Sequence, residues 1–176
     1  DRGGFNSNWA VNPPQSQTSV FGWCVRAWPT PSFFTGPMYD HTQGPPANGL
    51  HKYVYTEATF TSTNPAIPTR LRTPYINLTS VSQARLEFWV HMHGADMGSL
   101  VVDVDTGTSS NPAWVDSLWV QSGQLQNDSL DPWQRVVVSL DDFVGKNVRF
   151  RFLGYYGDGF RGDMAIDDVK VRTPYN

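Results

Sequence analysis

Hydrophobic and polar positions alternate most regularly between residues 82 and 105. Side chains that alternate along a strand point to opposite faces of its sheet, so this pattern predicts strands with one apolar face. The loop at residues 94–98, framed by two glycines, separates two such runs and predicts that they pair as a hairpin. The expected inward row is Leu86, Phe88, Val90, Met92, Leu100, Val102 and Val104, and the expected outward row is Glu87, Trp89, His91, His93, Asp103 and Asp105.

Shorter runs of the same alternation predict strands elsewhere in the chain. Residues 1–50 are rich in proline, glycine and asparagine, which predicts short strands and ordered loops that form a lid or an edge. Pro74 interrupts one run and predicts an edge or bulged strand, and a parity change at Asp167 and Asp168 predicts a β-bulge. About eight short strands without helical periodicity predict an all-β sandwich of Greek-key or jelly-roll type. Besides the opening pair, the expected strands are residues 52–60, 70–78, 117–121, 133–140, 147–153 and 164–172.

The composition narrows the class of protein. A chain of 176 residues favours one domain, which we expect to span residues 1–176. Hydrophobic residues make up 39%, but aromatic residues reach 14% with 7 Trp, so the core is expected to depend on large rings. A formal net charge of -3 gives no basic excess of the kind that binds nucleic acid. No apolar run approaches the ~20 residues that span a bilayer, so we expect no membrane insertion.

The cysteine content and the start of the chain say little about the compartment. Cys24 is the single cysteine, which excludes an internal disulfide framework and a cysteine-rich zinc site. We expect it to be a small buried hydrophobe. The chain opens at Asp1 without a signal peptide, as a module excised from a larger protein would.

Several short segments follow one another along most of the chain and together carry a resemblance to a known family. They include Asp40-His41-Thr42 and the closing Ala165-Ile166-Asp167-Asp168-Val169, and the others are residues 35–37, 53–58, 86–92 and 98–100 with Trp119 and Trp133. In this order and spacing they resemble the MAM domain. The resemblance implies a jelly-roll β-sandwich of two antiparallel sheets, found outside the cell as a non-catalytic module for adhesion or recognition.

The sequence departs from the family pattern in its cysteines. Animal MAM domains usually carry paired cysteines, whereas this chain has only Cys24. The departure indicates a bacterial-type relative, such as an accessory module within a larger secreted protein. It also puts in doubt the transfer of homophilic cell adhesion to this chain.

Acidic residues at opposite ends of the chain predict a structural cation, and we expect calcium, because calcium takes carboxylate and carbonyl oxygens. Asp40 and the pair Asp167 and Asp168 fit that description. Resemblance to MAM-like domains that hold such a cation assigns it to Asp40 and Asp168. In the alternative, Asp40 only caps a turn and Asp168 only forms hydrogen bonds within the last strand.

Aromatic and cationic side chains on three of the predicted strands suggest a ligand-binding platform. Sugars stack their C–H faces on aromatic rings, while arginine, histidine and carboxylates bind their hydroxyl or acidic groups. In the alternative, these rings are cross-strand pairs or lie beneath a loop such as residues 1–50. If the three strands share a sheet, the platform is Tyr53, Tyr55, Trp89, His91, His93, Arg149 and Arg151.

Glycine-rich loops offer a competing surface. Phe33 and Phe34 lie in one such loop, and residues 155–161 form another. We expect Phe33 and Phe160 to plug the ends of the sandwich instead. The integrin tripeptide Arg-Gly-Asp at residues 161–163 recurs too readily by chance to support a function.

The sequence does not support an enzyme. No nucleophile elbow, metalloprotease helix or phosphate loop is present. His91 and His93 share one strand face and would need a third ligand to hold zinc or copper, so exposed polar residues are the preferred interpretation. We therefore predict a non-catalytic, secreted recognition module that binds polysaccharide beside an attached enzyme. The alternative is a protein–protein adhesion or dimerisation module.

Overall fold

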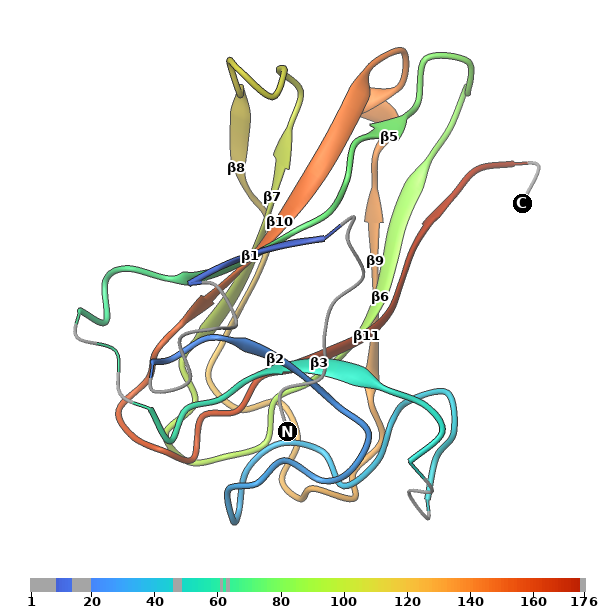
Figure 1. The fold of residues 1–176 in the computed structure, drawn as a ribbon. Coiled ribbons are helices and arrows are strands. Elements are labelled where there is room, and N and C mark those ends of the chain that lie inside the picture. The colour runs from blue at the N-terminus through green and yellow to red at the C-terminus, as the bar shows by residue number, and fades with distance from the viewer. Residues whose placement is uncertain (1–8, 14–19, 46–48, 61, 63, 175–176) are drawn as a thin grey trace.

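Two antiparallel sheets pack face to face in the computed structural model, which describes residues 9–13, 20–45, 49–60, 62 and 64–174 (Figure 1). The six-stranded sheet has the order β1–β4–β10–β7–β8, with β5 also on β10, and the five-stranded sheet has the order β2–β3–β11–β6–β9. The predicted all-β sandwich of jelly-roll type is therefore confirmed. The first sheet contains β1 (Ala10–Asn12), β4 (Thr69–Arg72), β5 (Ile76–Asn77), β7 (Ser99–Asp105), β8 (Trp114–Ser122) and β10 (Asn147–Tyr155). The second contains β2 (Trp23–Arg26), β3 (Tyr53–Thr56), β6 (Arg85–His91), β9 (Gln134–Ser139) and β11 (Ala165–Arg172).

The prediction that residues 82–105 form a hairpin is wrong. β6 pairs with β11 and β9 in the five-stranded sheet, whereas β7 pairs with β10 and β8 in the other sheet. The chain crosses between the sheets through Gly94, which has a φ of 143°. A Cβ there would lie 2.2 Å from the carbonyl oxygen of Arg161, so this close approach requires glycine. Alternation sets which side of a strand faces the core, but it does not name the partner strand.

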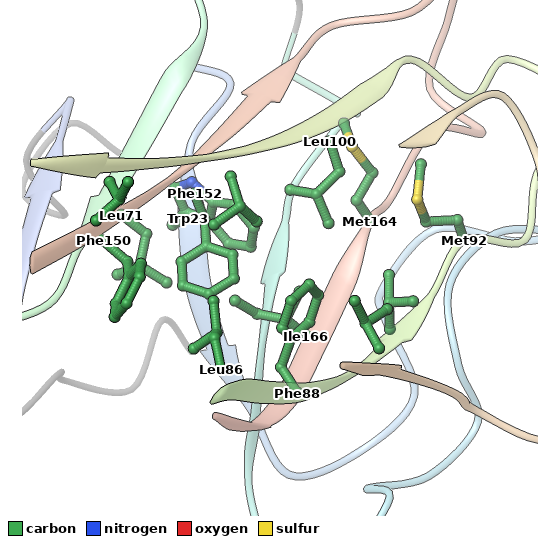
Figure 2. Packing of buried hydrophobic residues seen from close by; sticks show 14 of the residues in the cluster. Trp23, Leu71, Leu86, Phe88, Met92, Leu100, Phe150, Phe152, Met164 and Ile166 are labelled. Carbon is green, nitrogen blue, oxygen red and sulfur yellow. The ribbon is translucent and has the colours of Figure 1, made fainter. Parts of the chain in front are cut away.

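The core lies between the two sheets and is mostly aliphatic, because among its described buried residues only Phe21, Trp23, Phe88, Phe150 and Phe152 are aromatic (Figure 2). The expectation that the core depends on large rings is therefore wrong, although some of the rings contact one another. Phe88 on β6 meets Trp119 on β8 and Phe152 on β10, with ring centroids 5.2 Å and 5.3 Å apart and both contacts edge to face. Such contacts add to the free energy of burying the rings. The inward row predicted for the opening strands is confirmed, because every member is 0% exposed: Leu86, Phe88, Val90, Met92, Leu100, Val102 and Val104.

One of the two predicted irregularities of the strands is confirmed and the other is not. Pro74 lies between β4 and β5, where the expected strand over residues 70–78 breaks into two, but β4 lies between β1 and β10 with no register shift, so the expectation of an edge or bulged strand is wrong for β4. The β6–β11 register shifts between Asp167 and Lys170, and Asp168 has a φ of 48°, so the predicted β-bulge is confirmed. The bulge turns the side chains of the acidic pair toward the loop before β3, where the expected cation site lies.

A second, smaller core covers the outer side of the five-stranded sheet. Trp133 donates a hydrogen bond from its indole nitrogen to the carbonyl oxygen of Tyr39 at 3.1 Å, and the Tyr53 hydroxyl donates to the carbonyl oxygen of Trp28 at 2.7 Å. These bonds join the sheet to the loop after β2, so part of the predicted N-terminal lid is in place. The remainder falls in residues 1–8, 14–19 and 46–48, outside the described residues. The buried members of this core are Cys24, Tyr53, Tyr55, Trp133 and Ala165.

Candidate functional site

The residues predicted to form one platform lie on different sheets. Arg149 and Arg151 are on β10 of the six-stranded sheet, whereas Trp89 and His91 are on β6 of the other. The premise that the three strands share a sheet is therefore wrong. Each strand has the expected pattern of alternation, but alternation does not order strands in a sheet.

Tyr53, Tyr55 and His91 lie in the second core instead of facing solvent. They are 1%, 3% and 0% exposed. Burial raises the pKa of both tyrosine hydroxyls, so they stay protonated. The alternative considered for the platform, rings beneath a loop, is the arrangement found for these three side chains.

His91 is a buried, neutral histidine. Its ring lies edge-on to Trp133 at 5.5 Å, and neither ring nitrogen has a hydrogen-bond partner among the described residues. Burial lowers its pKa to about 4. His93 is half-buried, with Nδ1 3.3 Å from the carbonyl oxygen of Gln126. The structure therefore gives no support to a metal shared by these two histidines.

Trp89 is half-buried and stacks on His41, with ring centroids 3.8 Å apart and planes inclined by 19°. His41 also ties the loop after β2 to the bulge of β11. Its backbone N–H donates to Asp167 Oδ2 at 3.1 Å, and its Nδ1 lies 2.8 Å from Asp168 Oδ2. One face of the Trp89 ring is thus already covered, which leaves less of it for a ligand.

His41, Asp167 and Asp168 are the one group of three metal-ligating side chains found among the described residues, with ligand atoms within 4.8 Å of one another. Asp168 is already engaged: Thr42 donates to Oδ2 at 2.5 Å and Lys170 donates to Oδ1 at 2.9 Å. Burial opposes ionisation of Asp168, but these bonds and His41 lower its pKa to about 2. Lys170 already balances negative charge on Asp168, so less of that charge is left to attract a cation.

The other half of the expected cation site is the buried Asp40 and the half-buried Asp167. Asp40 is 2% exposed and accepts the backbone N–H of Gln43 at 3.0 Å, as a turn cap does. Burial, then the adjacent Asp40 carboxyl, raises the pKa of Asp167 to about 8. The raised pKa favours the protonated form of the Asp167 carboxyl at neutral pH.

A second buried carboxylate pair, Glu57 and Asp163, was missed in the sequence. Asp163 is 0% exposed; its Oδ1 accepts the N–H of Ala58 at 2.8 Å, and its Oδ2 has no hydrogen-bond partner among the described residues. Burial, then the charge of Glu57, raises the pKa of Asp163 to about 8. An orphaned carboxylate oxygen beside a second carboxylate fits a hard cation better than the saturated Asp168 does. Because Asp163 is buried, residues 161–163 cannot present its carboxylate to a receptor.

The outer face of the six-stranded sheet is ordered by buried ion pairs. Arg149 Nε donates to Asp105 Oδ2 at 2.8 Å, and Arg151 Nε donates to Asp103 Oδ2 at 2.7 Å. Both aspartates point outward as predicted, but they are 0% and 1% exposed because the arginines cover them. The Trp114 ring lies over both guanidinium groups, at 4.0 Å from Arg151 and 5.5 Å from Arg149.

Two hollows on this outer face meet at Arg151. The first is a shallow groove of about 600 Å³, and the second is a pocket of about 150 Å³ beside Trp114. Trp114, Arg70 and Arg72 were not among the predicted site residues, although the strand pattern would have placed them on the outer face had the pairing been known. The groove is lined by Ser99, Val101, Asp103, Asp116, Ser117, Val120, Ser122, Arg151, Leu153 and Tyr155, and the pocket by Ala10, Val11, Asn12, Arg70, Arg72, Trp114 and Arg151.

The aromatic loops do not plug the sandwich. Phe33, Phe34 and Phe160 are 79%, 75% and 50% exposed, so the expectation for Phe33 and Phe160 is wrong. The core between the sheets is filled by side chains of the strands and their flanking residues, and none of these three rings belongs to it among the described residues.

Fold and surface together define a β-sandwich module with an ordered, polar and aromatic outer face. The profile of the family described as MAM domain, meprin/A5/mu, matches residues 8–174. The chain belongs to the MAM domain family.

Among its relatives, Neuropilin-1a of Danio rerio is 29% identical over 182 residues, which cover 96% of this chain and 17% of the relative. MAM domain-containing protein 2 of Homo sapiens is 29% identical over 160 residues, 90% of this chain and 21% of that protein. The chain thus spans about a fifth or less of these relatives. Among solved structures, the K1 cleaved adhesin domain of Lys-gingipain from Porphyromonas gingivalis W83 shares the fold, with a TM-score of 0.58, 15% identity, and coverage of 98% of this chain and 94% of that domain.

Proposed function

We propose that the chain is a non-catalytic, extracellular recognition module that binds a polysaccharide along the outer face of the six-stranded sheet. The observation that carries the proposal is that Arg151 lines both the groove and the pocket, so that the two hollows are neighbours on this face. An extended hollow suits a chain of several sugar units. On this proposal the module belongs to a larger secreted protein and holds an attached enzyme near its substrate.

The chemistry of the face supports a sugar ligand. Trp114 offers a ring for stacking, and Ser99, Ser122 and Asp116 offer hydroxyl and carboxylate groups for hydrogen bonds. The buried ion pairs of Arg149 and Arg151 hold the floor in place before a ligand arrives. A pre-ordered surface lowers the entropic cost of binding, because fewer side chains must be immobilised.

The arrangement of carboxylates favours binding over hydrolysis. Asp103 and Asp116 lie in the groove, and both accept hydrogen bonds from Arg151, at 2.7 Å and 3.1 Å. A general acid must reach the leaving group of a substrate, whereas both of these carboxylates are held by the Arg151 guanidinium. Among the described residues, helices long and apolar enough to cross a membrane are absent.

Affinity electrophoresis against a panel of polysaccharides tests the proposal. Trp114→Ala should weaken retardation by at least about tenfold, because aromatic anchors dominate such surfaces. Trp89→Ala is the matched control on the opposite sheet and should leave retardation unchanged. If only Trp89→Ala abolishes retardation, the site lies on the five-stranded sheet. If no polysaccharide retards the wild-type protein, the proposal is overturned.

A protein–protein adhesion module is the second candidate, and exposed apolar loops favour it. Phe33, Phe34, Met38 and Leu130 are 79%, 75%, 41% and 58% exposed. Two of the loops that carry them are joined, since the N–H of Met38 donates to the carbonyl oxygen of Ser129 at 3.0 Å. Exposed apolar patches of this kind mark interfaces. Light scattering across concentration discriminates, because a dimer lost in Phe33→Ser/Phe34→Ser would support adhesion.

We also propose a structural calcium ion at the acidic end of the five-stranded sheet. The resemblance assigns it to Asp40 and Asp168, whereas the orphaned oxygen of Asp163 beside Glu57 favours the neighbouring pair. Either set supplies the oxygen ligands that calcium takes. The ion would hold the loop after β2 against β11 and would have no catalytic part.

A further inference from the structure

We propose that Arg70 and Arg72 form an oxyanion subsite beside Trp114 that selects acidic polysaccharides, with a carboxylate or sulfate substituent bound between the two guanidinium groups. The inference rests on the proposed function and names the class of polysaccharide. The shared chemistry is a planar or tetrahedral oxyanion, which arginine binds with paired N–H donors.

The arginines that the sequence pointed to are not the ones free to bind an anion. Arg149 is neutralised by Asp105, and Arg151 by Asp103 and Asp116. Arg70 and Arg72, by contrast, form no ion pair with any described residue. The unbalanced positive charge of this face therefore lies on β4.

The strand geometry places the two free arginines on the same outer surface. Leu71 between them is 0% exposed and points into the core, so Arg70 and Arg72 point outward. Both line the pocket beside Trp114. A ligand whose sugar ring lies on the indole would bring an acidic substituent within reach of the arginines.

The register of β10 and β4 leaves a positive charge without compensation. Arg72 lies directly opposite Arg151 in the antiparallel pair. Like charges at such positions repel and destabilise the sheet. The aspartates engage Arg151 from the β7 and β8 side, so Arg72 faces the pocket and has no ion-pair partner among the described residues. A bound anion would relieve that repulsion.

The experiment measures binding of polygalacturonate, dextran sulfate and unsubstituted dextran by isothermal titration calorimetry. Arg70→Gln/Arg72→Gln should weaken binding of the acidic polymers by roughly tenfold for each arginine, the loss of one charge-assisted hydrogen-bonding group. The matched control, Lys52→Gln/Lys146→Gln, removes the same charge from exposed lysines outside the pocket and should change affinity by less than about twofold. Thermal unfolding checks that all variants fold.

The outcomes separate this inference from the proposed function. Binding of polygalacturonate alone identifies a carboxylate subsite, and binding of dextran sulfate alone identifies a sulfate subsite. Equal losses in the arginine and lysine variants would mean that bulk charge drives binding, which overturns the subsite. Binding that depends on Trp114 but not on the arginines overturns the subsite and keeps the module a polysaccharide binder. If no polysaccharide binds in calorimetry or in electrophoresis, both the oxyanion subsite and the proposed function are overturned.

Discussion

At the scale of single residues, His91 carries a pH-dependent contribution to stability. Its ring is 0% exposed, and burial, assisted by the charge of His93, lowers its pKa to about 4 while Asp131 and Asp128 oppose the shift weakly. In the unfolded chain the same ring takes up a proton near pH 6.5. The free energy of unfolding should therefore fall as the pH falls from about 6.5 to 4, by about 3 kcal/mol from this group.

Replacing the histidine isolates its contribution. His91→Leu has a similar volume and no group to protonate, so it should lose less stability than the wild type between pH 7.5 and pH 4.5. Urea unfolding of both proteins at the two pH values measures the difference, and other titrating groups cancel in it. Equal losses in the two proteins would show that the ring is already protonated or solvated in the folded state.

The buried carboxylates give a second prediction at this scale. If calcium binds the folded chain but not the unfolded chain, a chelator should lower the melting temperature and added calcium should restore it. Asp163→Asn should abolish this response if Asp163 and Glu57 hold the ion, whereas Asp168→Asn should abolish it if the ion lies with Asp40. Differential scanning calorimetry measures both variants, and a wild type indifferent to chelator would leave all four carboxylates as proton-sharing or turn-capping groups.

At the scale of elements, the crossing from β6 to β7 depends on one glycine. Gly94→Ala should destabilise the fold by on the order of 2–4 kcal/mol, because the left-handed φ and the contact with the Arg161 carbonyl leave no room for a methyl group. Gly123→Ala is the control: it also has a positive φ, 72°, but a Cβ there meets nothing within 4 Å. It should cost only about 1 kcal/mol.

Chemical unfolding of the two glycine variants measures this difference. If both variants lose a similar free energy of unfolding, the backbone conformation alone sets the loss, and the close contact at Gly94 can relax. The comparison matters because the crossing decides in which sheet each of the two strands lies.

At the scale of the whole molecule, the two outer faces have different roles. The five-stranded sheet is covered by the loop after β2 and by the segment that carries Trp133, which together bury Tyr53, Tyr55 and His91. Among the described residues, the groove, the Trp114 pocket and the ordered ion pairs all lie on the outer face of the six-stranded sheet. The proposed polysaccharide is assigned to this sheet because its hollows suit an extended ligand.

Alternation and turn residues were enough to predict the class of fold, the inward row of the opening strands, the interruption at Pro74 and the bulge at Asp167 and Asp168. These features are local, because a side chain's position along a strand fixes the face to which it points. The shared family segments, from Asp40-His41-Thr42 to the closing acidic pair, added the MAM domain.

Only the tertiary structure decided which strands are neighbours, and with them the site. Placing β6 and β7 in different sheets separated Trp89 from Arg151, and pairing β10 with β7 set Arg149 opposite Asp105 and Arg151 opposite Asp103. Strand order depends on contacts between residues far apart in the chain, and alternation carries no information about them. For that reason the predicted arginines proved neutralised, and the unpaired charges of Arg70 and Arg72 became visible only once β4 was placed beside β10.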